Sequence, residues 1–464
     1  MADQEYERDE QLLEARRLRR MELKRKRKIR QRITLGVLLA ILALIILLVT
    51  KSCGKSGNTA PQPVAPQETQ AAETTAASQD AKATLSAVGD IMVYDTQLAD
   101  AKQTDGSYNF LPSFAPVSDL LTASDLTVGN LEGTFSGEPY SGKPNFSAPD
   151  SLATTLAGLG FDVLQTANTY SIQNGLAGLT RTVNTVRNEG MNALGTFLSA
   201  EDKTANQVAV REVNGVKIAF IGFTKGVNNL SLPDGASYAV NLLYKDYSTT
   251  YKDIDKTAIT TAIETAKAKQ PDVIVAMVHW GSEYELEPSA SQKEIADLMF
   301  QNGVDVILGS HSHIVGPMEK RSVTVDGKSK DVFVAYSLGN FLSGMTKDYT
   351  QESAILNLEF TKDGKSGETK ISNIDYVPLR IMDNGEKAVN RYEVQNVYTL
   401  LSSNPSDTVK TTLSTTIADL ASHTASDFAR PAGASAAAGT SAAGGETTTA
   451  KTSGETTTTA AQGG

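Results

Sequence analysis

Short apolar runs that each end in polar, chemically active residues are the feature that most constrains how this chain can fold. Three such runs, rich in Val, Ile and Phe, lie within residues 271–344, at 273–278, 304–308 and 332–336. Between the first two, Ser291 and Glu294 have the spacing of a capping box, and Gly303 stands where a left-handed C-terminal cap belongs, so we predict a helix there. Strand, helix and strand in succession predict an α/β sheet, whose ligands bind beyond the carboxyl ends of the strands.

Histidines follow these runs. Three of the four histidines in the chain, His279, His311 and His313, come directly at the strand ends. A single histidine after a strand is more often a hydrogen-bonded structural residue than a ligand. Two imidazoles in a His-x-His loop can converge on one cation, however, and His279 comes from the preceding unit of the same sheet. Imidazole suits several transition metals, so the pattern predicts a divalent metal site without identifying the metal.

The same pattern recurs closer to the amino terminus. Strand candidates at 84–88, 125–128 and 161–164 are followed by polar residues: Asp90, Asn130, Glu132, Asn168 and Tyr170. Each could have an ordinary role, since Asp90 could cap a turn, the asparagines could bond loop backbone and Glu132 could be solvated. Taken together, polar groups at the ends of six strands are hard to explain without metal chemistry, so they predict a metal site at one edge of the sheet.

Local sequence patterns predict the helices and the turn that connect these strands. Residues 114–123 and 176–189 have helical patterns, the latter stopped by Gly190, and Asp150 is expected to cap the helix before 161–164. Asn214-Gly215 has the signature of a type I′ hairpin turn.

An uncharged apolar segment, residues 33–50, is just long enough to span a bilayer as a helix. The leader before it, residues 1–32, contains 12 Lys or Arg and 7 Asp or Glu, so the positive-inside rule places it in the cytoplasm. A cleaved signal peptide is the alternative, but the long basic leader and the lack of a small-x-small cleavage signal favour a retained anchor. We therefore predict a single-pass protein of the cell membrane, with its main domain extracellular.

Composition divides the rest of the chain. Residues 51–83 predict a flexible linker, 84–425 one large domain, and 426–464, rich in Ala, Thr, Gly and Ser, a disordered tail. The net charge is −10 at pH 7, and the +5 of the leader leaves −15 for the remainder, which argues against nucleic-acid binding. The single cysteine, Cys53, excludes an intrachain disulfide.

Five motifs occur in order along residues 84–380: Gly89–Met92, Asn130–Glu132, His279–Tyr284, Gly309–His313 and Ser337–Phe341. Together they resemble the CapA-type poly-γ-glutamate capsule biosynthesis proteins, a family placed in the calcineurin-like metallophosphoesterase superfamily. The resemblance implies a metallophosphoesterase-like α/β/β/α sandwich. In this chain the transmembrane helix predicted from residues 33–50 would precede it. The resemblance also implies a site for one or two divalent transition-metal ions, with manganese, iron and zinc as candidates.

The resemblance implies a role for each residue of that site. The metal ligands would be Asp90, Glu132, His279, His311 and His313, and Asn168 is a further candidate ligand. Glu132 would bridge two ions. Asn130 and Asn340 would support the ligands or face the substrate, and Tyr170 would stand where the superfamily's proton donor stands.

The chain departs from the family pattern at that last position. Where the family reads Ala-Asn-Asn-His, this sequence reads Ala167-Asn168-Thr169-Tyr170. The superfamily's histidine protonates the leaving group, and a tyrosine, with an ordinary pKa of about 10, is a weaker donor at neutral pH. Thr169 replaces the metal-binding asparagine and is a poorer ligand, unless Asn168 takes over, so the sequence favours one metal over two.

Two functions are compatible with these residues. In the first, a membrane-anchored extracellular protein of capsule or poly-γ-glutamate biosynthesis and export uses metal-activated water on a phosphoester or γ-glutamyl amide. In the second, the site is degenerate and the protein is a membrane-tethered binding or assembly component for extracellular polymer. The five retained ligands favour the first and Tyr170 favours the second. The expected partners are the membrane, the capsule polymer and its synthesis or export complex.

Overall fold

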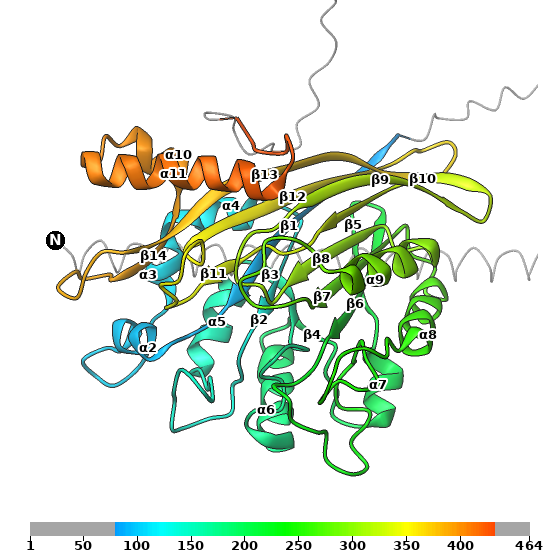
Figure 1. Cartoon of the computed structure of the whole chain (residues 1–464), viewed down its shortest axis with the longest axis horizontal. Coiled ribbons are helices and arrows are strands. Elements are labelled where there is room, and N and C mark those ends of the chain that lie inside the picture. The colour runs from blue at the N-terminus through cyan, green and yellow to red at the C-terminus, as the bar shows by residue number, and fades with distance from the viewer. Residues whose placement is uncertain (1–78, 432–464) are drawn as a thin grey trace, which may run out of the picture.

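The computed structural model describes residues 79–431 (Figure 1). The predicted leader, the predicted anchor at 33–50 and nearly all of the predicted linker lie outside these residues. Within the described part of the chain, no helix combines the length and the apolar character needed to cross a membrane.

Two sheets form the centre of the described region (Figure 1). The first has eight strands in the order β14-β13-β12-β1-β2-β3-β4, with β11 paired to β1: β1 (Ala81–Ile91), β2 (Leu126–Leu131), β3 (Phe161–Gln165), β4 (Asn192–Leu194), β11 (Asn340–Leu342), β12 (Glu352–Lys362), β13 (Thr369–Asp383) and β14 (Tyr392–Asn396). The second has six, in the order β5-β6-β7-β8-β10-β9: β5 (Ala209–Val213), β6 (Val216–Thr224), β7 (Val273–His279), β8 (Val306–Ser310), β9 (Met318–Val325) and β10 (Lys328–Ala335).

Parallel pairing brings the functional strand ends together. The strands β1, β2, β3 and β4 run parallel in the first sheet, and β6, β7, β8 and β10 do so in the second. Because parallel strands end at the same edge of a sheet, the residues after β1 and β2 lie side by side, as do those after β7 and β8. The predicted α/β organisation is confirmed, although the polar groups come from two sheets.

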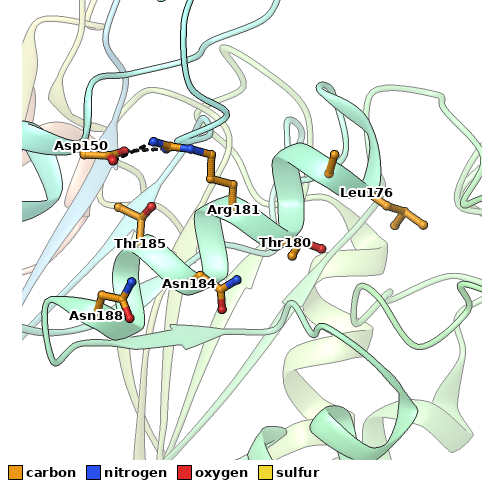
Figure 2. A pocket seen from close by; sticks show the side chains of 8 residues that line it. Asp150, Leu176, Thr180, Arg181, Asn184, Thr185 and Asn188 are labelled. Atoms are coloured by element: carbon orange, nitrogen blue, oxygen red, sulfur yellow. Dashed lines mark hydrogen bonds and ion pairs between the residues drawn. The ribbon is translucent and has the colours of Figure 1, made fainter.

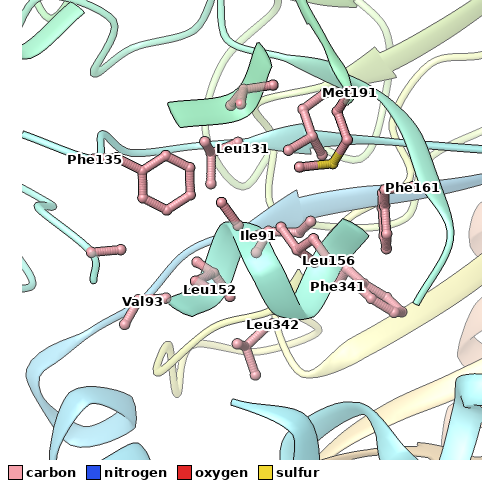
Figure 3. Packing of buried hydrophobic residues seen from close by; sticks show 14 of the residues in the cluster. Ile91, Val93, Leu131, Phe135, Leu152, Leu156, Phe161, Met191, Phe341 and Leu342 are labelled. Carbon is pink, nitrogen blue, oxygen red and sulfur yellow. The ribbon is translucent and has the colours of Figure 1, made fainter. Parts of the chain in front are cut away.

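Buried side chains arrange these elements in layers. One apolar cluster lies between the sheets and joins Leu85 of β1 to Phe220 of β6 and Met277 of β7. A second cluster packs helices on the outer face of the first sheet, where Leu152 and Leu156 approach Ile91 and Phe341 (Figure 3). A third packs two helices against the outer face of the second sheet. The order of layers is therefore helix, sheet, sheet, helix.

The helices fill the connections. They are α2 (Asp95–Ala101), α3 (Leu111–Phe114), the 3₁₀ turn η1 (Ala115–Val117), α4 (Ser118–Ala123), α5 (Asp150–Gly158), α6 (Gly175–Asn188), α7 (Ala200–Asn206), α8 (Lys256–Lys267), α9 (Ala290–Gln301), α10 (Val397–Ser402) and α11 (Asp407–Thr424). The predicted helix at 176–189 corresponds to α6. The one predicted at 114–123 is broken into α3, η1 and α4, because Pro116 has no N–H to continue a helical ladder.

Two predicted caps are wrong. Helix α9 begins two residues earlier than expected, because Ser289 and Gln292, rather than Ser291 and Glu294, form the capping box. Glutamine closes such a box as well as glutamate does. Asp150 is the first residue inside α5, and its carboxylate accepts two hydrogen bonds from the Arg181 guanidinium, at 2.6 and 2.8 Å.

Two predicted turns are confirmed. Gly303 follows α9 with a φ of 106°, in the left-handed region that glycine tolerates. Asn214 and Gly215 both have positive φ between β5 and β6, as a type I′ hairpin requires.

The described chain extends past 425. There the Tyr376 amide of β13 donates a hydrogen bond of 2.8 Å to the Phe428 carbonyl.

Candidate metal centre

The ends of strands from both sheets converge on one buried cluster. Asp90 is the penultimate residue of β1, and Glu132 directly follows β2. His279 is the last residue of β7, and His311 and His313 follow β8. All five side chains are buried. The structure therefore brings together five of the six residues that the sequence predicted as ligands.

Carboxylates and imidazoles form two groups in this cluster, each with its candidate ligand atoms within 4.8 Å of one another. In the first, which contains Asp90, Glu132 and His313, the His313 Nδ1 atom lies 3.2 Å from an Asp90 oxygen and 4.0 Å from Glu132 Oε2. In the second, with Glu132, His279 and His311, the His279 Nε2 atom lies 3.4 Å from Glu132 Oε1.

Glu132 belongs to both groups, so the arrangement has the form of two adjacent cation sites with a shared carboxylate. Its side chain is 1% exposed, and its Oε2 atom has no hydrogen-bond partner among the described residues. An ionised oxygen buried in this way is costly unless a cation or a proton satisfies it. This observation, with the mixed carboxylate and imidazole donors, fits a divalent transition metal.

The two histidines of the His-x-His loop have an unusual backbone conformation. The φ angles of His311 and His313 are 96° and 61°, in the left-handed region that few non-glycine residues adopt. Such strain is retained where the surrounding structure enforces it, which is common at functional sites.

Two glycines allow the supporting strands to come this close. A Cβ atom on Gly89 would overlap the carbonyl oxygen of Gly339, and one on Gly309 would overlap that of Tyr336. The first contact sets the register in which Asp90 pairs with Asn340, and the Asp90 amide donates to the Gly339 carbonyl at 2.8 Å. Close main-chain packing thus fixes the position of Asp90.

Burial and neighbouring charges shift the pKa values of the titratable groups in the cluster in different directions. Burial raises the pKa of Asp90, but the hydrogen bond and the charge of His313 outweigh burial and hold that pKa below its ordinary value of 3.8. Burial opposes the charged form of His313, yet Glu132 and Asp90 raise its pKa to about 9. Burial and the charge of His279 hold the pKa of His311 well below 6.5. Without a cation, His313 is therefore protonated at neutral pH and His311 is not.

Three asparagines connect the strand ends. Asn130 donates to Asp90 at 2.8 Å, and the Oδ1 atom of Asn340 lies 3.1 Å from His313 Nδ1. Asn168 donates to the Leu131 carbonyl at 2.6 Å and to the Oδ1 atom of Asn130 at 3.2 Å. Its own Oδ1 accepts from the Tyr170 amide at 3.1 Å, so the polar atoms of Asn168 are engaged in holding the loop.

Thr169 and Tyr170 occupy the positions where the sequence departs from the resembled family. The Thr169 hydroxyl lies 2.9 Å from His279 Nε2 and 3.4 Å from His311 Nδ1, so threonine, rather than Asn168, contacts the second group. The Tyr170 ring packs against Phe146, with ring centroids 4.5 Å apart. Burial and the charge of Glu132 raise the pKa of Tyr170 above its ordinary value of 10.

Two residues at the site were missed by the sequence analysis. Ser310 places its hydroxyl 2.9 Å from His279 Nδ1 and so fixes the orientation of that ring. Lys225 follows β6, donates to the Gly281 carbonyl at 2.6 Å, and lowers the pKa of His311 by its charge. The position of Lys225 directly after the strand β6 is the sequence feature that could have identified it.

A separate cavity of about 620 Å³ lies along α6 (Figure 2). It is lined by Asp150, Leu176, Ala177, Thr180, Arg181, Asn184, Thr185 and Asn188. The charged residues that line this cavity, Arg181 and Asp150, are paired with each other by a bidentate contact. The volume of the cavity is therefore not evidence that it is a catalytic site.

Comparisons with known proteins agree with the motifs. The family model described as "Bacterial capsule synthesis protein PGA_cap" matches residues 84–345, more than half of the chain. The PGA biosynthesis protein CapA of Bacillus subtilis (strain 168) is 28% identical over 299 residues, which cover 62% of this chain and 70% of that protein. The capsule biosynthesis protein CapA of Bacillus anthracis is 26% identical over 339 residues, covering 70% and 73% respectively.

Among solved structures, the calcineurin-like phosphoesterase YfkN from Bacillus subtilis aligns with 75% of this chain and 100% of its own, at 15% identity and a TM-score of 0.37. Similarity at this level carries no argument about chemistry, which has to come from the residues of the site.

Proposed function

Because this chain belongs to the PGA_cap family of bacterial capsule synthesis proteins, we propose that it is a membrane-anchored, extracellular component of capsule or poly-γ-glutamate biosynthesis with a metal-dependent hydrolase or transferase site. The observation that carries the enzymatic part is Glu132, a buried carboxylate shared by two ligand groups and left with one unpartnered oxygen.

The described residues would hold one or two divalent cations. Asp90, Glu132 and His313 would bind one, and Glu132, His279 and His311 the other. When bound, such a cation supplies Lewis-acid chemistry that activates water and polarises a phosphoryl or acyl group.

The protein's own residues set the conditions for that chemistry. His311 is already neutral at pH 7 and is ready to bind a cation, whereas His313 must first lose a proton. Lys225 places a positive charge beside the second group, which favours a substrate with a phosphate or carboxylate. Tyr170 keeps its proton at neutral pH and can donate a hydrogen bond, but it is a poor source of a proton for a leaving group.

Metal removal and pH together test the enzymatic proposal. We expect the full-length protein to hydrolyse an activated aryl phosphate weakly, to lose this activity on chelation and to regain it with manganese or zinc.

Since His313 has a pKa of about 9, a proton competes with the cation at any lower pH. The cation concentration that restores half of the activity should therefore fall by about tenfold from pH 7 to pH 8. Activity that survives chelation, or a half-restoring concentration that does not change with pH, would contradict this assignment.

Topology is a separate expectation from the sequence. With the basic leader inside and residues 33–50 across the bilayer, protease added to intact cells should remove the domain that contains the strand-end site. A tag placed on the amino terminus should survive the same treatment, because it would lie in the cytoplasm. Protection of the domain in intact cells, with cleavage only after lysis, would refute this topology.

Tyr170 supports a second candidate function. A site without an efficient proton donor suits a tethered binding or assembly component for extracellular polymer, in which the cation binds carboxylates of the polymer without turnover.

A further inference from the structure

The candidate ligands of the strand-end site are closed off from solvent in this structure. Asp90 and His279 are fully buried, and the most exposed of the five ligands, His311, has 6% of its surface exposed. A cation or a substrate oxygen cannot reach ligand atoms that are covered to this extent. Some of the surrounding side chains therefore have to move before anything binds, as lids do in many enzymes.

An aromatic wall beside Thr169 is fixed in place. Phe146 is 2% exposed and Tyr170 is 8% exposed, and their rings pack with centroids 4.5 Å apart. Tyr94 adds an edge-on contact with Phe146, at 5.0 Å between ring centroids. The fully buried Met92 belongs to the same apolar cluster. Because Phe146 and Tyr170 are held by buried neighbours, neither ring can leave without opening a cavity.

On His313 the covering side chains form a stack that runs from solvent to the ligand. Lys347 is exposed, Tyr284 is half-buried and His313 is 2% exposed. The Lys347 Nζ atom lies 3.6 Å from the centroid of the Tyr284 ring, and the centroids of the Tyr284 and His313 rings lie 5.9 Å apart. The tyrosine ring thus connects a buried ligand with a lysine at the surface.

This stack is held weakly at its outer end. The contact between the Lys347 ammonium and the Tyr284 ring is a cation–π interaction, which contributes little at an exposed position. Among the residues that the structure describes, Lys347 forms no ion pair that would add to this contact. The lysine can therefore leave the ring at a small cost in free energy.

The main chain on both sides of the stack is fixed. The Tyr284 amide donates to the Ser312 carbonyl at 2.8 Å, within the His-x-His loop. Behind Lys347, the Thr350 amide donates to the Lys347 carbonyl at 3.1 Å, and the Thr350 carbonyl accepts from Asn340 at 2.9 Å. Both segments are thus tied to the strand-end site, and the parts that can move are the two side chains.

We propose that Tyr284 and Lys347 form a gate over the strand-end site, which is closed in this structure and opens when the lysine leaves the ring and the ring turns away from His313. The inference rests on the cation site proposed above and adds how reactants enter it. An open gate exposes His313 to an incoming cation or substrate, and a closed gate keeps bulk water away from the buried ligands.

Acylation of histidines in the metal-free, full-length protein tests the gate without reference to turnover. Diethyl pyrocarbonate modifies an imidazole only when it reaches an unprotonated ring, and peptide mass spectrometry measures each histidine separately. Lys347→Gln should speed the modification of His313 by about two- to fivefold, which is the size of an exposed cation–π contact. Tyr284→Ala should speed it by about tenfold or more, because no ring then has to open locally.

A change in the titration of His313 cannot produce this result. Removing the positive charge of Lys347 favours protonation of a neighbouring imidazole, and a protonated imidazole does not react with the reagent. Such an effect would slow the modification of His313, whereas opening of the gate speeds it.

Conservative variants and an internal reference separate the gate from a general loosening of the chain. Lys347→Arg keeps a cation over the ring and Tyr284→Phe keeps the ring, so both should react at the wild-type rate. Lys370→Gln, at an exposed lysine of β13, is the matched control and should also react at that rate. His423 is the internal reference, because Tyr349, in the same turn as Lys347, packs against it with ring centroids 4.6 Å apart. An unchanged rate at His423 shows that this turn has kept its structure.

Two results would overturn the gate. One is an equal rate at His313 in the wild type, in Lys347→Gln and in Tyr284→Ala. The other is a faster reaction at both His313 and His423, which would mean that the turn had unfolded. Should Tyr284→Ala fail to fold, Lys347→Gln decides the matter, because it changes only an exposed side chain.

Zinc binding separates a failure of the gate from a failure of the proposed cation site. In zinc-loaded protein, a chelator should remove the metal faster from Lys347→Gln than from wild type, and fastest from Tyr284→Ala. Zinc that leaves all three proteins at one rate would count against the gate and leave the cation site intact. A chain that binds no zinc would refute the cation site, and the reaction of His313 would still decide whether the gate exists.

Discussion

The full-length protein with both His311→Ala and His313→Ala should lose its strand-end metal and hydrolyse an aryl phosphate about a thousandfold more slowly than wild type. His311 belongs to one ligand group and His313 to the other, and both groups contain Glu132. The double substitution therefore removes one ligand from each group. A bound cation contributes several kcal/mol to stabilising a charged transition state, and a thousandfold corresponds to about 4 kcal/mol. Metal analysis of the purified protein and the rate of aryl-phosphate hydrolysis are the two measurements.

The remaining histidine supplies a matched control. His423→Ala makes the same chemical change away from the strand ends and should leave aryl-phosphate hydrolysis close to wild type. Circular dichroism of the double variant is needed as well, because removing His313 leaves the buried carboxylate of Asp90 without its nearest cation. A folded double variant with wild-type metal content and rate would show that these histidines do not form the site.

The combined substitution Thr169→Asn and Tyr170→His should raise hydrolysis of a substrate with a poor leaving group, such as an alkyl phosphate or a γ-glutamyl amide, by about 10²–10⁴-fold. An alkoxide or an amine needs a proton as it leaves, whereas p-nitrophenolate does not. Tyr170 is a weak donor because burial raises its pKa, and a histidine there titrates near neutral pH. The asparagine would restore an oxygen ligand beside His279 and His311, where the threonine hydroxyl now lies.

The comparison between substrates makes this test specific. Hydrolysis of an activated aryl phosphate should change little in the same variant, so the ratio of the two rates is the quantity to measure. Tyr108→His repeats the tyrosine exchange at a ring that packs against Tyr140 and should not change that ratio. A folded, metal-loaded double variant that remains inert on every ester and amide would favour the tethered assembly function over the enzyme.

Much of the fold and the centre of the site follow from local sequence patterns. The apolar run at 273–278 becomes β7, and its position predicts that His279 lies at a strand end. The same reasoning places His311 and His313 after β8. These predictions succeed because strand ends in parallel sheets meet at one edge, so a short local pattern determines a long-range contact.

Other features depend on contacts that no local pattern records. Whether Asn168 or Thr169 faces the histidines is decided by the turn after β3, and there the hydroxyl of Thr169 lies nearer. Glu352 and His423 are far apart in the sequence, and only the packing of α11 on the sheet brings them within 4.0 Å. Ser291 and Glu294 fitted a capping box as well as Ser289 and Gln292 do, and composition could not choose between them.

The close main-chain contacts at Gly89 and Gly309 bear on how a genetic screen of this protein would be interpreted. Neither residue has a side chain that could take part in a reaction, yet any replacement would push a Cβ atom into the carbonyl oxygen of Gly339 or Tyr336. Alleles at these two codons would therefore be scored as null, alongside alleles at Asp90 and His311. A map of intolerant positions would accordingly outline the scaffold of the site as well as its ligands, and intolerance alone would not distinguish the two.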